Sequence, residues 1–215
     1  MSKLILFQGD SITDCDRNRQ VHIRQGFGYA TMVQGQLGYD CPSEYEFQNR
    51  GISGNRIIDV YARIKADIIN LKPDYMSLLI GVNDVWHELG GNNGIAPEKF
   101  EKIYCMLIEE IKEALPEIKI MLLEPFVLPG CATVDDEDPT VWERFNTLVR
   151  ANAAAVKRVA EKYSLPFIEL QSGFDALSEK APASYWLADG VHPTAAGHQM
   201  IADAWLDLFR REIAR

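Results

Sequence analysis

Short apolar runs alternate with longer amphipathic stretches along the whole chain. The run at residues 4–7 is continuous, as expected for a strand covered on both faces, and further strand-like runs lie at residues 45–47, 75–80, 118–123 and 167–170. Apolar residues at helical spacing occupy the intervals, at residues 28–37, 56–69, 97–115, 139–163 and 194–208. Strands that alternate with helices of this length predict one α/β domain over residues 1–215, with a parallel sheet between two layers of helices.

Local signals mark where several helices begin or end. Asp138 followed by Pro139 is typical of an N-cap and the first helical residue, and Pro97 suits the first turn of an earlier helix. Thr194 is placed to cap the last helix. The polar, glycine-rich stretch at 90–94 predicts a loop that separates the third strand from the next helix.

The composition is that of an ordinary globular protein. Of the 215 residues, 47% are hydrophobic and 25% are charged, and the formal net charge is -9. Nucleic acids and anionic membrane surfaces bind best to basic patches, so this negative charge disfavours both as partners. No stretch is long and apolar enough to span a bilayer, and no secretory signal is evident. The four cysteines lack metal-ligand spacing, so we expect free thiols and a cytoplasmic protein.

A candidate nucleophile follows the first apolar run. Gly9, Asp10 and Ser11 stand where that strand gives way to a helix, and in open parallel sheets ligands bind beyond the carboxyl ends of the strands. A serine there exposes its hydroxyl and leaves its backbone N–H able to donate to a developing oxyanion. Taken alone, the tripeptide favours the simpler interpretation that Asp10 or Ser11 only caps the next helix.

A candidate base and an orienting carboxylate lie near the other end of the chain. Asp189 precedes His192 by three residues, across a turn at Gly190. That spacing lets the carboxylate reach Nδ1 of the imidazole, which fixes the tautomer and leaves Nε2 to accept a proton from a serine. The alternative is again capping, before the helix that Thr194 begins. Together with Ser11, these residues supply the parts of a Ser-His-Asp acyl-transfer site.

Two further segments follow strands and carry hydrogen-bond donors. Residues 51–55 follow the second strand, and residues 81–84 follow the third. A glycine N–H can approach an oxyanion closely, and the amide of Asn83 is a neutral donor of suitable reach. Glycine and asparagine also favour turns, so each segment alone is weak evidence. Four such segments in order at strand ends favour an active site.

The other histidines and a possible cation cluster have simpler explanations. His22 lies in a polar loop and His198 within the last helix, whereas His87 follows the third strand closely enough to line the site. Asp14, Asp16 and His22 could gather near a cation, but a solvated loop explains them better. We therefore expect no metal site.

Further candidates for substrate contact are Asp10, Trp86 and Trp186. The two tryptophans could form a platform for a sugar or an acyl group, or they could serve as core. An α/β-hydrolase could host the same triad, but it requires Gly-x-Ser-x-Gly at the nucleophile, and Thr13 replaces the second glycine here. That fold is disfavoured.

The four segments resemble the sequence blocks of the SGNH hydrolases, also called GDSL esterases or lipases, over essentially the full chain. They are Gly-Asp-Ser-Ile at 9–12, Ile-Ser-Gly-Asn at 52–55, Gly-Val-Asn-Asp at 81–84 and Asp-Gly-Val-His-Pro at 189–193. The resemblance implies a flavodoxin-like, three-layer α/β/α sandwich with a central parallel sheet, and no cofactor.

The same resemblance assigns a role to each block. It implies that Ser11 is the nucleophile, His192 the base and Asp189 its orienting carboxylate. It also implies an oxyanion hole formed by the backbone N–H groups of Ser11 and Gly54 and the side-chain amide of Asn83.

Within this family the motifs are most similar to those of compact intracellular acetyl esterases of the acetylxylan esterase type. That similarity implies removal of O-acetyl groups from xylo-oligosaccharides, with a small-molecule or oligosaccharide ester as the partner. A lysophospholipase or thioesterase of the same family and a non-catalytic carbohydrate-binding module remain alternatives. The last helix and residues 127–138 could bury a second copy of the chain or simply complete the domain, so a homo-oligomer stays open.

Overall fold

A five-stranded parallel sheet forms the centre of the protein in the computed structural model, which describes residues 2–21 and 23–213. The strands lie in the order β2-β1-β3-β4-β5, and every neighbouring pair is parallel. Their bounds are Lys3–Gly9 for β1, Tyr45–Asn49 for β2, Tyr75–Leu79 for β3, Lys119–Leu123 for β4 and Phe167–Ile168 for β5. Each strand lies on a predicted apolar run, so the expected parallel α/β sheet is confirmed.

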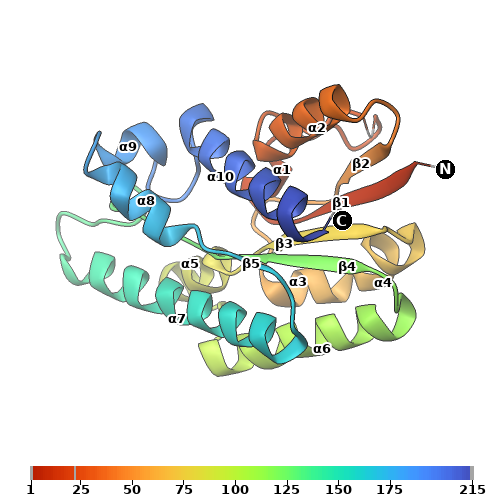
Figure 1. Cartoon of the computed structure of the whole chain (residues 1–215). Helices are drawn as coiled ribbons and strands as arrows, with labels where there is room; N and C mark the ends of the chain where they lie inside the picture. The colour runs from red at the N-terminus through yellow and green to blue at the C-terminus, as the bar shows by residue number, and fades with distance from the viewer. Residues whose placement is uncertain (1, 22, 214–215) are drawn as a thin grey trace.

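Helices cover both faces of this sheet, as Figure 1 shows. One layer consists of α2 (Tyr29–Asp40), α8 (Gln171–Ser178) and α10 (Ala195–Leu208). The other layer consists of α3 (Ile57–Ala62), α4 (Ile64–Asp67), α6 (Pro97–Ala114) and α7 (Thr140–Tyr163). Three further helices are α1 (Ser11–Asp14), α5 (Val82–Gly91) and α9 (Ala183–Trp186). No helix within the described residues is long and apolar enough to cross a membrane.

Successive residues of the interior strand β1 pack into different layers. Ile5 and Phe7 join the core formed with α2 and α10, whereas Leu6 joins the core formed with α3, α6 and part of α7. All three side chains are fully buried. A strand with helices on both faces has no solvated side, which explains why its sequence is a continuous apolar run rather than an alternating one.

The single helix expected over 56–69 is wrong, because this segment is broken into α3, α4 and a 3-10 turn at Ile69–Leu71. Arg63 separates α3 from α4, with φ −111° and ψ 15°. Its guanidinium donates to the Arg50 carbonyl oxygen at 2.8 Å and to Gln8 Oε1 at 2.7 Å. The side chain also pairs with Asp67 of α4 at 2.9 Å, so it joins that helix to β1 and to the segment after β2 at the point where the backbone leaves the helical region.

The loop expected at 90–94 begins later than the glycines indicate. Helix α5 continues through Gly90 and Gly91 and ends at Asn92, whose φ of 51° is left-handed. The Asn92 N–H donates to the Glu88 carbonyl oxygen at 3.0 Å, and Glu88 Oε2 accepts the Gly94 N–H at 3.0 Å. Asparagine in a left-handed C-cap is a common helix ending, so these contacts extend the helix over the two glycines.

The predicted capping of two helices is borne out with a small shift. Asp138 Oδ1 accepts the Thr140 N–H at 3.0 Å, and α7 begins at Thr140 rather than at Pro139. Thr194 Oγ1 accepts the Gly197 N–H at 3.3 Å at the start of α10.

The carboxyl ends of the first three strands meet at one edge of the sheet. In the observed register Phe7 pairs with Asn49, and Gly9 pairs with Leu79. The segments that follow β1, β2 and β3 therefore start side by side. These segments are α1, residues 51–55 and α5, and they carry three of the four motifs.

Candidate active site

The sharp turn after β1 places Ser11 at the start of α1. Asp10 caps this helix, because its Oδ1 accepts the Ile12 N–H at 3.0 Å. A Cβ on Gly9 would lie 2.3 Å from the Leu79 carbonyl oxygen. Only glycine allows the chain to pass this close to β3 on its way to Ser11.

Ser11, His192 and Asp189 form one continuous line of hydrogen bonds. Ser11 Oγ lies 2.8 Å from His192 Nε2, and His192 Nδ1 lies 2.7 Å from Asp189 Oδ2. Asp189 Oδ1 accepts the backbone N–H groups of Val191 and His192, both at 2.8 Å. The structure thus brings together a hydroxyl and an imidazole from the two ends of the chain.

The protonation state of Asp189 follows from these bonds. Burial alone would raise the pKa of this carboxyl, but hydrogen bonds from the His192 backbone and ring and from the Val191 N–H outweigh it and lower the pKa. Asp189 is therefore an anion at neutral pH and accepts the proton on His192 Nδ1. Nε2 is then the unprotonated nitrogen that can accept the hydrogen of Ser11 Oγ.

A second loop holds the turn that carries Asp189 and His192. Gly190 has a φ of 99°, and a Cβ there would lie 2.5 Å from the Leu128 carbonyl oxygen. The Leu128 N–H donates to the Gly190 carbonyl oxygen at 2.9 Å, and the Ala132 N–H donates to the Asp189 carbonyl oxygen at 2.9 Å. The turn is thus fixed by backbone contacts with residues 128–132.

Two of the expected oxyanion donors lie beside Ser11. Gly54 has a left-handed φ of 80°, and no heavy atom lies within 4 Å of where its Cβ would be. The conformation of the backbone, rather than lack of space, is what requires glycine there. Asn83 is buried in the first turn of α5, and its Nδ2 donates to the Asn55 carbonyl oxygen at 3.1 Å.

These groups surround one hollow of about 450 Å³. It is lined by Ser11, Ser53, Gly54, Asn83, Trp86, His87 and His192. The Trp86 ring lies 5.8 Å from the His192 ring and packs edge-on against Phe145 at 6.1 Å, which holds it in place. A hydroxyl, a base and convergent donors on one concave surface can carry out acyl transfer.

Two residues expected to contact substrate do not line this hollow. Asp10 is 1% exposed, and burial raises its pKa to about 7. Its carboxyl serves as the cap of α1, so it has no surface to offer a substrate. Trp186 is half-buried and packs edge-on against Tyr185 at 4.9 Å. Trp86 alone of the two tryptophans reaches the site.

The remaining histidines differ in their surroundings. His87 lines the hollow. His198 is buried, its Nδ1 accepts the Tyr29 N–H at 3.2 Å, and its Nε2 lies 3.5 Å from Cys15 Sγ. Burial lowers the pKa of His198 to about 4, so it is a neutral residue of the helix packing. His22 lies outside the described residues.

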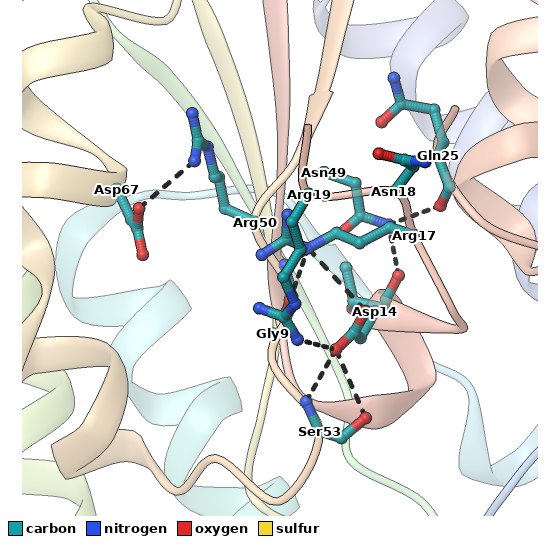
Figure 2. A network of polar contacts seen from close by, with 12 residues as sticks. Gly9, Asp14, Arg17, Asn18, Arg19, Gln25, Asn49, Arg50, Ser53 and Asp67 are labelled. Carbon is teal, nitrogen blue, oxygen red and sulfur yellow. Dashed lines mark hydrogen bonds and ion pairs between the residues drawn. The ribbon is translucent and has the colours of Figure 1, made fainter. Parts of the chain in front are cut away.

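The solvated-loop interpretation of Asp14 and Asp16 is wrong for Asp14. This carboxylate is buried, whereas Asp16 is exposed. Asp14 Oδ2 accepts hydrogen bonds from the Ser53 N–H and from Arg19 (Figure 2). Within the described residues, no group of three or more His, Cys, Asp and Glu side chains could hold a metal ion.

Sequence reasoning missed the contact between Ser53, at the hollow, and Asp14, which lies outside it. Ser53 lies directly before Gly54 and lines the hollow. Asp14 lies three residues after Ser11 and 39 residues before Ser53, its hydrogen-bond partner. The only local signal was a second acidic residue, Asp14, on the short helix that begins with Ser11.

Comparison with known proteins gives the same family from sequence and from structure. Residues 7–200 match the GDSL-like Lipase/Acylhydrolase family. An acetylxylan esterase from Geobacillus stearothermophilus is 32% identical over 212 residues, which cover 94% of this chain and 91% of that protein.

Solved structures agree with this assignment. A candidate GDSL-like lipase from Parabacteroides merdae has a TM-score of 0.88 at 36% identity, over 96% of each chain. The acetylxylan esterase Axe2 from Geobacillus stearothermophilus has a TM-score of 0.83 at 32% identity, over 95% of this chain and 93% of that chain. The chain therefore belongs to the GDSL-like lipase/acylhydrolase family, has the SGNH hydrolase fold and is a carboxylic-ester hydrolase.

Proposed function

We propose that the protein removes O-acetyl groups from short xylo-oligosaccharides by a serine mechanism. One observation carries this proposal, namely the line of hydrogen bonds from Ser11 Oγ through His192 to Asp189 beside a hollow that Gly54 and Asn83 also line. Oligosaccharides that have entered the cell are the expected substrates, so we expect the enzyme to act in the cytoplasm. Its four unpaired cysteines fit a reducing compartment.

The reaction proceeds in two steps. Ser11 Oγ attacks the acetyl carbonyl carbon while His192 Nε2 accepts the hydroxyl proton, and the same nitrogen returns that proton to the departing sugar oxygen. Water then attacks the acetyl-Ser11 ester, with His192 again taking a proton and returning it to Ser11. Asp189 holds the imidazole in the required tautomer and stabilises the imidazolium that forms in each step.

The negative charge of each tetrahedral intermediate forms on the former carbonyl oxygen. The backbone N–H groups of Ser11 and Gly54 and the Nδ2 of Asn83 donate to it. Nδ2 carries two hydrogens, and one already binds the Asn55 carbonyl oxygen, which fixes the amide plane before substrate arrives. Donors that need no rearrangement contribute most to such catalysis.

The proposal of an acetyl group, rather than a longer acyl group, rests on the position of Trp86 beside His192. The Trp86 ring packs against both His192 and Phe145 and so limits the room beside the reacting carbonyl. The xylo-oligosaccharide substrate is proposed from one relative, an acetylxylan esterase, a variant of which carries the name acetyl-xylooligosaccharide esterase.

Acid released from acetylated xylo-oligosaccharides and from a matched octanoyl ester tests this function, with Ser11→Ala as control. Fast acetate release that Ser11→Ala abolishes is the expected result. Preference for octanoate would keep the serine mechanism and replace the proposed substrate with a lipid or a thioester. Release of neither acid, together with heat evolved on mixing with the sugar, would instead indicate a non-catalytic carbohydrate-binding module.

A further inference from the structure

We propose that Asp14 is a positioning residue that holds the Gly54 N–H at its correct distance from Ser11. This role rests on the proposed function, because it acts on the oxyanion donor of that reaction. Asp14 does not line the hollow. It acts through Ser53, the residue directly before Gly54.

The contact joins the two segments whose spacing matters for catalysis. Asp14 ends helix α1, which begins with Ser11. Its Oδ2 accepts the Ser53 N–H at 3.0 Å and lies 3.4 Å from Ser53 Oγ. The carboxylate therefore ties the end of the nucleophile helix to the residue that precedes the glycine donor (Figure 2).

Two arginines keep this carboxylate in place. Arg19 Nη2 donates to Asp14 Oδ2 at 3.0 Å, and Arg17 Nε lies 3.9 Å from Asp14 Oδ1. Arg17 also donates from Nε to the Gly51 carbonyl oxygen at 2.8 Å, so it binds the same segment at a second point. The Asp14 and Arg17 side chains are 6% and 5% exposed, whereas Arg19 is 54% exposed. Solvent therefore competes little with the inner pair.

Packing alone does not fix the position of Gly54. The segment is tightly seated at Gly51, where a Cβ would lie 2.4 Å from the Asp14 backbone nitrogen. The Ile52 N–H then donates to the Gly9 carbonyl oxygen at 3.1 Å. At Gly54 no heavy atom lies within 4 Å of where a Cβ would be, so no close packing holds the backbone on that side. The bond from Ser53 to Asp14 is thus the last contact of the segment before Gly54, and the Asn55 N–H closes the turn behind it by donating to the Ile52 carbonyl oxygen at 3.1 Å.

This arrangement has a specific kinetic consequence. Loss of the Asp14 anchor leaves Ser11, His192 and Asp189 bonded to each other and leaves Gly54 in the chain. Only the distance and direction of one donor change. An oxyanion donor acts on the transition state rather than on the bound ester, so its displacement lowers kcat while KM stays the same.

The test compares Asp14→Ala and Asp14→Asn with the wild type on an acetyl ester. We expect Asp14→Ala to lower kcat by about 10- to 100-fold, part of the loss for a deleted donor, with KM within about twofold. Asparagine keeps an oxygen that can accept the Ser53 N–H, so Asp14→Asn should recover most of the activity. All rates are expressed per active site, counted by complete labelling with a fluorophosphonate, so that a misfolded fraction does not lower kcat.

A second readout separates positioning from general support of the fold. A short alkylboronic acid adds to the serine hydroxyl as a tetrahedral anion and uses the same donors as the transition state. Its affinity should fall in Asp14→Ala by about the same factor as kcat. If Asp14→Ala does not fold, Asp14→Glu keeps the charge but displaces the carboxylate by one methylene, and it should show the same paired loss.

Asp74→Ala is the matched control. Asp74 Oδ2 accepts the Leu4 N–H at 2.8 Å, which is the same kind of contact beside the sheet but outside the site. We expect its kcat per active site and its boronate affinity to equal those of the wild type. An unchanged kcat per active site in Asp14→Ala and Asp14→Glu would overturn the positioning role alone. Acetate release by Ser11→Ala in the same assay would overturn the proposed function instead.

Discussion

Asp189 binds His192 with both of its carboxylate oxygens. Oδ2 lies 2.7 Å from the ring Nδ1, and Oδ1 accepts the backbone N–H of the same histidine at 2.8 Å. His192 and Asp189 thus form one short turn whose internal geometry is set locally. Only the position of this turn relative to Ser11 depends on the rest of the fold.

Replacement of Asp189 by asparagine should damage kcat far more than KM. The amide cannot accept the Nδ1 hydrogen as the carboxylate does, so the imidazole loses the tautomer that leaves Nε2 free for Ser11. We expect a fall in kcat of roughly 10⁴, with little change in KM. Steady-state kinetics on an acetyl ester measure both. A change confined to KM would assign Asp189 to substrate binding.

Two glycines that both have open space around them should respond to alanine in opposite ways. In Gly54→Ala an alanine must adopt the left-handed φ of 80°, which should lower the free energy of unfolding by about 1–2 kcal/mol. The strain should also displace the backbone N–H at this position and lower kcat. Gly35 lies inside α2, where alanine should stabilise the protein by about 0.5–1 kcal/mol and leave kcat unchanged. Urea unfolding and kinetics on both variants provide the comparison. A Gly54→Ala variant with normal stability and kcat would contradict the account of this position.

The stability of the protein should fall as the pH rises from about 4 to 7, in part because of Asp84. Burial raises the pKa of this carboxyl from 3.8 to about 7, and both its oxygens lie 3.2 Å from the Ile57 nitrogen. In this window the unfolded chain releases the proton and the folded chain keeps it, so higher pH favours unfolding.

The Asp84→Asn variant isolates this effect. Asparagine never ionises, so the free energy of unfolding of the variant minus that of the wild type should grow by up to about 4 kcal/mol between pH 4 and pH 7. Urea unfolding at several pH values measures this difference, in which the titration of groups that do not interact with Asp84 cancels. A difference that is flat across the window would show that Asp84 does not retain its proton.

Trp86 should set the length of the acyl group. Its removal opens the hollow beside His192, so Trp86→Ala should lower kcat/KM for acetyl esters by about 10-fold and raise the ratio of octanoyl to acetyl hydrolysis. Trp142→Ala is the matched control, because Trp142 is also half-buried but does not line the hollow. Equal substrate ratios in both variants and the wild type would exclude Trp86 as the limiting wall.

Much of the fold followed from the sequence because its strands are buried on both faces. Ile5, Leu6 and Phe7 are all fully buried, and that burial is what their continuous apolar run predicted. The break at Arg63 could not be predicted, because it coincides with contacts to Gln8 and Arg50, which are distant in sequence. A helical pattern of apolar residues carries no information about such partners.

The candidate site, like the fold, could be predicted only in part from the sequence. The motifs around Ser11 and His192 were predictable, since each follows a strand or opens a helix at one sheet edge. Asp10 was misplaced, because its position beside the nucleophile does not reveal that its carboxyl turns inward to cap α1. Asp14 was missed, because its role depends on Ser53, 39 residues away.

The central claim is that Ser11 forms a covalent acyl intermediate. Mass spectrometry of the protein after treatment with a fluorophosphonate tests it most directly, with acetate release followed in the same samples. We expect one adduct per chain, on the peptide that contains Ser11, and loss of acetate release in proportion to labelling. An adduct on another residue that abolishes acetate release, or full activity in a chain labelled at Ser11, would contradict the claim.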